Sequence, residues 1–157
     1  MRKRIVAPVQ QQTASPDQDW LNVEGLAEVE ITSEDAAHPI ESALLPGSTS
    51  GWRAAGPGKQ TIRLLFANPQ RLRRIRLNFE EARIERMQEY VLRWSPDGGQ
   101  SFREIVRQQW NFSPGGATAQ MEDHHVELPA VTVLELIIIP DTSGGNAIAS
   151  LAQLRLA

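Results

Sequence analysis

The chain has 157 residues, 41% of them hydrophobic, which is enough for one well-buried core and too short for two domains of ordinary size. With 16 basic and 19 acidic residues its formal net charge is -3, which excludes a global positive field that would draw the molecule onto nucleic acid or an anionic membrane. The absence of cysteine excludes disulfides, thiolate zinc sites and cysteine nucleophiles, and it is compatible with a reducing compartment.

The first stretch of the chain has no apolar period and is rich in Gln, Pro, Ser and Thr. We predict a flexible arm over residues 1–18 and a single domain over residues 19–157. The basic residues Arg2, Lys3 and Arg4 are followed by an apolar run that Pro8 ends, so we expect no signal peptide. Every apolar run is far shorter than the roughly 18 residues that a membrane span requires. We therefore expect no membrane span and a cytoplasmic location.

Strands are predicted wherever apolar and polar residues alternate, because every second side chain of a strand lies on the same face. Glycine, proline and asparagine pairs such as Asn68-Pro69 and Gly115-Gly116 mark turns between them. This pattern predicts an all-β, antiparallel sandwich or barrel of about eight strands. One competing helical turn is predicted over residues 80–88, which are good helix formers. The predicted strands cover residues 26–32, 62–66, 75–79, 90–94, 102–110, 117–128, 131–139 and 148–156.

Several segments carry a resemblance to a known family. Residues 31–39, 42–45, 51–54 and 60–64 resemble the opening of discoidin or coagulation-factor C-type domains, and residues 90–102 resemble that family's strand, Ser-x-Asp-Gly turn and following strand. The resemblance covers roughly residues 20–157. It implies a galactose-binding-like jelly roll that binds sugars, lipid head groups, proteins or nucleic acid through loops at one end. Trp52 and Trp94 then fall at positions where an aromatic ring fills the core.

A narrower likeness is to the N-terminal domain of the X-ray-repair scaffold protein. It rests on Ser33-Glu34-Asp35, on Leu44-Leu45 and on residues 52–55, Trp-Arg-Ala-Ala. This likeness implies a protein partner or a nicked DNA end. In many sugar-binding relatives an Asp-Gly pair and a Glu in the last strand help to hold a structural calcium ion. This chain has Leu45-Pro46 and Gln153 there, so we predict no metal and no cofactor.

The ligand-binding prediction centres on Trp110, where a predicted strand runs into a glycine-rich loop. An exposed indole flanked by hydrogen-bonding side chains suits a sugar, and it equally suits an unpaired base or a protein hot spot. The competing interpretation is that Trp110 and Phe112 belong to the core. The predicted ligand-binding residues are Arg86, Arg107, Gln109, Trp110, Asn111 and His124.

The remaining charged residues give weaker signals. Arg74 and Arg76 share one strand face, but interleaved glutamates favour a neutralised surface over a nucleic-acid site. His124 and His125 are neighbours on a strand, so they point to opposite faces and do not chelate a metal together. The pair Asp35 and His38 is the other cluster with proton-transfer or metal chemistry.

The sequence holds no motif of an enzyme. A nucleophile elbow, a phosphate loop, a zinc-protease helix and a dinucleotide fingerprint are all missing. We therefore predict a non-catalytic recognition module that binds carbohydrate through loops at one end of the sandwich. The alternative is an intracellular scaffold domain that binds a protein or, less favoured, a DNA end.

Overall fold

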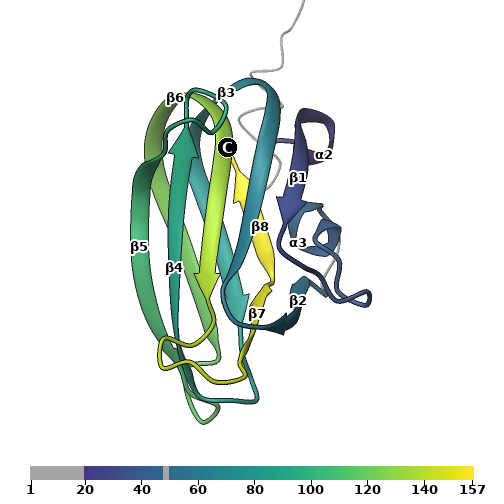
Figure 1. The fold of residues 1–157 in the computed structure, drawn as a ribbon, viewed down its shortest axis with the longest axis vertical. Coiled ribbons are helices and arrows are strands. Elements are labelled where there is room, and N and C mark those ends of the chain that lie inside the picture. Colours follow the sequence, from purple (N-terminus) through teal and green to yellow (C-terminus); the bar gives the residue numbers. More distant parts are fainter. Residues whose placement is uncertain (1–19, 48–49) are drawn as a thin grey trace, which may run out of the picture.

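The structure, a computed structural model, describes residues 20–47 and 50–157. The arm predicted over residues 1–18 lies outside the described residues. Strands dominate, and two one-turn helices lie beside them (Figure 1). In chain order the elements are α2 (Val23–Leu26), β1 (Ala27–Ile31), α3 (Glu41–Leu44), β2 (Trp52–Pro57), β3 (Gln60–Glu80), β4 (Arg86–Ser95), β5 (Arg103–Phe112), β6 (Ala119–Ile139), β7 (Ile148–Leu151) and β8 (Gln153–Leu156).

The strands form two layers that share their two longest members. The first half of β3 and the second half of β6 lie in a five-stranded layer with the order β1-β3-β6-β4-β5. The other halves of β3 and β6 pair with each other, and β3 also pairs with β8 in the opposite layer. A short sheet of β2 and β7 closes one end. All of these pairings are antiparallel, which confirms the predicted all-β sandwich.

The strand divisions differ from the prediction at the bend between the layers. The predicted turn at Asn68-Pro69 is an irregular stretch within β3, where the register with β6 shifts between Leu65 and Arg74. Pro69 and Pro129 occur at this bend, and proline has no N–H to donate to a ladder. Four predicted strands therefore merge into two. The strand predicted over residues 148–156 is instead two strands, and β2 was not predicted.

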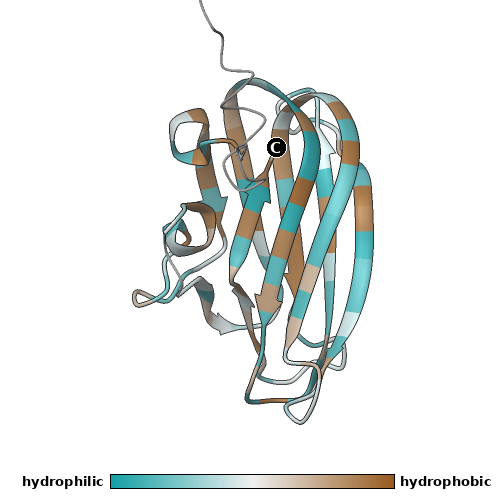
Figure 2. Cartoon of the chain, turned by 180° about the vertical axis from the view of Figure 1, so that it is seen from behind, coloured by the Kyte–Doolittle hydropathy of each residue, from teal (hydrophilic) through white to brown (hydrophobic). Residues whose placement is uncertain are grey.

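The core lies between the layers and follows the predicted alternation. Ile75, Leu77 and Phe79 have no exposed surface, and the residues between them are partly exposed. Figure 2 shows this alternation as brown and teal bands along the strands. Trp52 and Trp94 are buried, as predicted. Burying an aromatic or aliphatic side chain of this size contributes roughly 1.5–3 kcal/mol, so the interlayer core is the main source of stability.

The helical turn predicted over residues 80–88 is wrong. Glu80 ends β3, residues 81–85 form a connection, and β4 begins at Arg86. The side chains of Arg86 and Gln88 are both buried while Met87 between them is exposed, which is the period of a strand. Pairing with β5 outweighs the modest helix propensity of residues 86–88 because it gives their backbone groups hydrogen-bond partners.

The C-terminal strand holds α3 in place. The Arg155 guanidinium donates hydrogen bonds to the carbonyl oxygens of Ala43, at 2.8 Å, and Leu45, at 3.2 Å. The carbonyls at the end of a helix have no partner within the helix, so this cation satisfies them. A pocket of about 470 Å³ lies beside this contact and is lined by Leu45, Pro46 and Gln153 among others.

Candidate functional site

A small polar pocket of about 150 Å³ lies at the end of the sandwich that β2 and β7 close, which we call the loop end. It lies where β2, β7 and the last residue of β3 meet. The lining combines a guanidinium, a carboxylate, an imidazole and two hydroxyl groups, so it holds both hydrogen-bond donors and acceptors. Its lining residues are His38, Ser50, Trp52, Arg53, Glu80, Ser150, Leu151 and Ala152.

Local sequence explains why β2 builds one wall of this pocket. Trp52 and Ala54 are buried, so the alternation of the strand turns Arg53 outward. Gly51 precedes them with φ +69°, and a Cβ atom there would lie 2.8 Å from the carbonyl oxygen of Leu151. Only glycine allows β2 to approach β7 this closely, because any side chain would collide with the neighbouring backbone.

The loop before β2 is fixed against the same strand. The N–H of Asp35 donates to the carbonyl of Arg53 at 2.8 Å, and the N–H of Arg53 donates to the carbonyl of His38 at 3.2 Å. The indole N–H of Trp52 donates to the carbonyl of Ser33 at 3.0 Å. Because backbone and core groups make these bonds, His38 and Arg53 are held before any ligand arrives.

Asp35 and His38 form a pair at the rim of the pocket. Nδ1 of His38 lies 3.2 Å from Oδ2 of Asp35, and the two side chains are 39% and 42% exposed. The N–H of Ala37 and the His38 ring hydrogen-bond the Asp35 carboxylate and hold its pKa below its ordinary value. A carboxylate only accepts, so Nδ1 carries the proton of this bond and Nε2 is left for another partner.

Three of the predicted ligand-binding residues share the outer face of β5. Arg107, Gln109 and Asn111 are exposed there, and Trp110 between them faces the other way. Arg107 is 53% exposed, and its guanidinium is held at 3.1 Å by each of Glu89 and Glu104. The predicted residues therefore do not form one surface.

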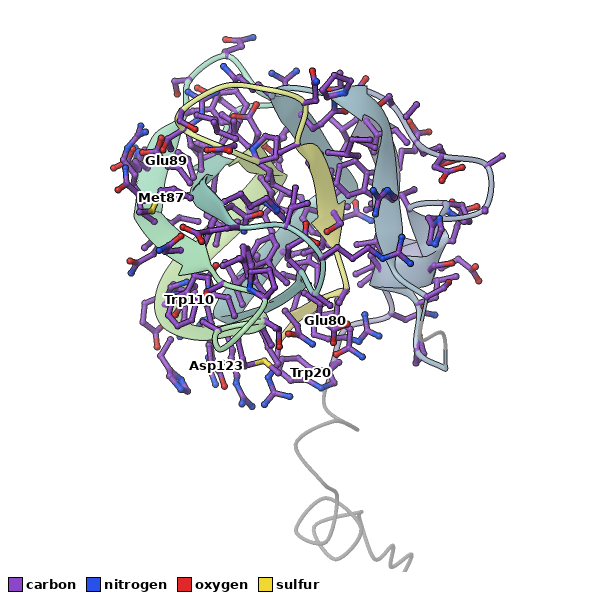
Figure 3. The ribbon with its side chains drawn as sticks, turned by 90° about the horizontal axis from the view of Figure 1, so that it is seen from below. Trp20, Glu80, Met87, Glu89, Trp110 and Asp123 are labelled. Carbon is purple, nitrogen blue, oxygen red and sulfur yellow. The ribbon has the colours of Figure 1, made fainter. Side chains whose placement is uncertain are left out.

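Trp110 lies on the inner side of β5, partly buried against the core. Its cross-strand partner is Gln88, which is buried, and its indole nitrogen is buried as well. Phe112, two residues on, has no exposed surface. Figure 3 shows Met87 and Glu89 together at the outer edge of the molecule and Trp110 apart from them, on the side of Asp123. Part of the indole stays exposed, so the prediction of a sugar contact at Trp110 remains a prediction.

His124 projects into the sandwich from β6. Its Nε2 lies 2.7 Å from the hydroxyl of Tyr90, which is buried on β4. Burial and the nearby carboxylate of Glu122 raise the pKa of Tyr90, so this phenol stays neutral and keeps its proton for hydrogen bonding. The prediction was that His124 hydrogen-bonds a ligand hydroxyl, whereas here it bonds a hydroxyl of the chain itself. His125 is exposed on the opposite face, as predicted.

Arg86, predicted as a charged ligand contact, lies in the interior instead. Its side chain has no exposed surface, and its Nε donates to the Glu81 carboxylate at 2.9 Å. Its Nη1 donates to Gln88 at 2.9 Å and to the Pro140 carbonyl at 2.8 Å. Burial opposes ionisation of Glu81, but the bond and charge of Arg86 and the backbone N–H groups of Arg83 and Ile84 together outweigh it, so the pKa of Glu81 is lowered. A guanidinium enclosed in this way does not reach a ligand on the surface.

The strand arginines are neutralised as predicted, but by Asp123 of β6 and not by the interleaved glutamates. Arg74 donates two hydrogen bonds to Asp123, at 2.8 and 2.5 Å, and Arg76 lies 3.6 Å from the same carboxylate.

Within residues 20–47 and 50–157, no group of three or more acidic or histidine side chains is placed to hold a metal ion. No helix in this part of the chain is long and apolar enough to cross a membrane.

Sequence reasoning missed most of the pocket. His38 was singled out only together with Asp35, and Arg53, Glu80 and Ser150 were not selected. One signal was present, because a buried Trp52 followed by Arg53 on a strand requires Arg53 to point outward. The meeting of β2 with β7 carries no such signal, since those strands are almost a hundred residues apart in the sequence.

Several solved structures have a fold similar to that of this chain. A carbohydrate-binding module from a family 31 glycoside hydrolase of Clostridium perfringens is 18% identical, with a TM-score of 0.66 over 92% of this chain and 97% of that chain. The family 32 module of C. perfringens NanJ, in complex with galactose, is 14% identical, with a TM-score of 0.65 over 87% and 96%. A pectin-binding module is 13% identical, with a TM-score of 0.61 over 83% and 89%.

These likenesses confirm the predicted galactose-binding-like jelly roll, which matches almost the whole of each module. The sequence itself matches no protein-family model and no curated protein. At these identities the shared property is the fold, and ligand and site must be argued from the residues of this chain.

Proposed function

We propose that this chain is a non-catalytic carbohydrate-binding module and that the pocket at its loop end receives one sugar unit. The observation that carries the proposal is the preorganised set of His38, Arg53 and Glu80 on a fold whose solved neighbours are carbohydrate-binding modules. One of those neighbours is in complex with galactose and another binds pectin, so a sugar is the class of ligand that the fold favours.

The pocket has the chemistry of a hydroxyl-rich ligand. Arg53 donates hydrogen bonds, Glu80 accepts them, and His38 presents a nitrogen, so neighbouring hydroxyl groups of a sugar find complementary partners. Trp52 is buried and offers no open ring face, so hydrogen bonds rather than stacking provide recognition. A small pocket that opens to solvent suits the end of a glycan better than the middle of a chain.

A glycan array followed by calorimetry with the best ligand tests this proposal. Arg53→Gln removes a charged hydrogen-bond donor and should weaken binding about tenfold or more. Arg107→Gln is the matched control, because it removes another exposed arginine, from the outer face of β5. If Arg53→Gln binds the glycan as the wild type does and Trp110→Ala loses glycan binding, the binding site lies on β5 instead. An array without any bound glycan would overturn the proposed function.

The alternative function is the intracellular scaffold domain that binds a protein or a DNA end. Arg74 and Arg76 are neutralised by Asp123 and so offer no basic patch on their strand, and the solved neighbours lend the narrower likeness no support. A cytoplasmic location belongs with this alternative and stays a prediction. Binding of nicked duplex that falls steeply with salt would favour it, because phosphate neutralisation releases counterions.

A further inference from the structure

The strand β1 forms an open edge of the five-stranded layer. It pairs with β3 on one side and ends the strand order there. An edge strand presents backbone N–H and C=O groups that no neighbouring strand takes up, which makes it a template for a further strand. Its five residues alternate in burial, with Ala27, Val29 and Ile31 turned towards the core and Glu28 and Glu30 exposed.

Three hollows lie around β1. One, of about 240 Å³, has an apolar floor formed by Val29, Ile40 and Leu44 and lies between β1 and the two helices. The other two, of about 670 and 410 Å³, lie over the ladder that β1 makes with β3, because residues of both strands line them. The hollow of 240 Å³ has no lining residue from β3, so it is the one that can receive side chains of a strand added at the free edge of β1.

The same edge carries an excess of negative charge. Glu24, Glu28, Glu30 and Glu41 are all exposed. Within the described residues none of the four has an ion-pair partner, unlike the carboxylates on the outer face of β4 and β5. A row of unneutralised carboxylates beside an apolar hollow favours a ligand with both aliphatic and cationic side chains.

We propose that β1 is a docking edge for an extended peptide segment of a partner protein in which aliphatic residues alternate with Lys or Arg. The added strand places its aliphatic side chains beside Val29, over the hollow floored by Ile40 and Leu44. Its cationic side chains lie across from Glu28 and Glu30, where opposite charges stabilise a cross-strand pair. This surface is separate from the loop-end pocket, so the proposal does not depend on sugar binding.

A second copy of the chain fits the edge poorly. Antiparallel pairing of two β1 strands would bring Glu28 and Glu30 of one copy against the same residues of the other. Like charges opposed across strands are destabilising, and charged edge strands deter self-association for this reason. The carboxylates therefore select a basic partner and reject the chain itself.

The test is an NMR titration of the ¹⁵N-labelled full chain with a blocked six-residue peptide in which valine alternates with lysine. Amide shifts should cluster on residues 24–32 and 40–45. The double charge reversal Glu28→Lys with Glu30→Lys should weaken this peptide about tenfold and gain binding to the peptide with glutamate in place of lysine. Glu85→Lys with Glu127→Lys is the control for net charge and should leave binding unchanged.

Three results would overturn the proposal. The first is equal binding of the lysine and glutamate peptides, and the second is a set of amide shifts that do not cluster on β1. The third concerns the basic residues Arg2, Lys3 and Arg4. If changing these three to glutamine moves the β1 amides without added peptide, the chain's own segment occupies the edge and the partner peptide is the wrong occupant.

Discussion

Two polar regions of this molecule contain similar residue types but have different roles: one stabilises the fold, and the other is open to a ligand. In the interior region Arg86 bonds Gln88 and Tyr90 bonds His124, and one nitrogen each of Arg86 and Gln88 is buried without a partner among the described residues. The loop-end pocket, with His38, Arg53 and Glu80, is open, and mainly backbone bonds hold it in place. Arginine and histidine therefore indicate a binding site only where their hydrogen bonds are left for a ligand, and this depends on burial rather than on residue type.

The interior region should respond most strongly to mutation. Arg86→Leu leaves the Glu81 carboxylate and the Pro140 carbonyl without their partner, and it should lower the free energy of unfolding by about 3 kcal/mol. Urea denaturation measures the loss. Arg107→Leu, on the neighbouring strand, should cost less than about 1 kcal/mol, because exposed ion pairs contribute little. Equal losses in the two variants would remove the distinction between the regions.

Tyr90→Phe tests the hydrogen bond between Tyr90 and His124 in the interior region. It removes the hydroxyl that lies 2.7 Å from His124 and should lower the free energy of unfolding by about 1 kcal/mol. Sugar affinity should not change, because Tyr90 does not line the pocket. A loss of sugar affinity with unchanged stability would instead favour His124 as a ligand contact.

The turn at Asp97 gives a pH-dependent effect that neither polar region provides. Hydrogen bonds from Ser101 and Ser95 lower the pKa of Asp97 to about 2. Because this is below its ordinary value of 3.8, the ionised form stabilises the fold fully above about pH 4, and the contribution disappears as the pH falls towards 2. The Tm difference between the wild type and Asp97→Asn should therefore be largest above pH 4 and vanish near pH 2. A Tm difference that stays constant over this pH range would contradict the stabilising role of the ionised Asp97 carboxylate.

Arg53→Gln should have the smallest effect on stability. Arg53 is exposed and its backbone makes the hydrogen bonds that fix the loop, so changing the side chain should alter the free energy of unfolding by no more than about 0.5 kcal/mol. The same variant should lose sugar binding. A large loss of stability would mean that the pocket, like the interior region, is structural.

The sequence predicted the sandwich because alternation reports which side chains face the core, as Ile75, Leu77 and Phe79 show. It predicted the strand ends poorly, since the bend of β3 at Pro69 depends on where β6 turns. It also grouped Arg107, Gln109 and Asn111 with Trp110 as neighbours in the chain, although alternation on a strand separates them. The pocket escaped prediction because His38, Arg53 and Glu80 come together only through the pairing of β2 and β7.

The most direct test of the central claim is to map the bound sugar on the labelled full chain by NMR, using the best glycan from the array. The account predicts amide shifts around His38, Arg53, Glu80 and Ser150, with little change along β5. Shifts concentrated on Arg107, Gln109 and Asn111, or on Trp110 and His124, would contradict it and place the site on β5 and β6 instead.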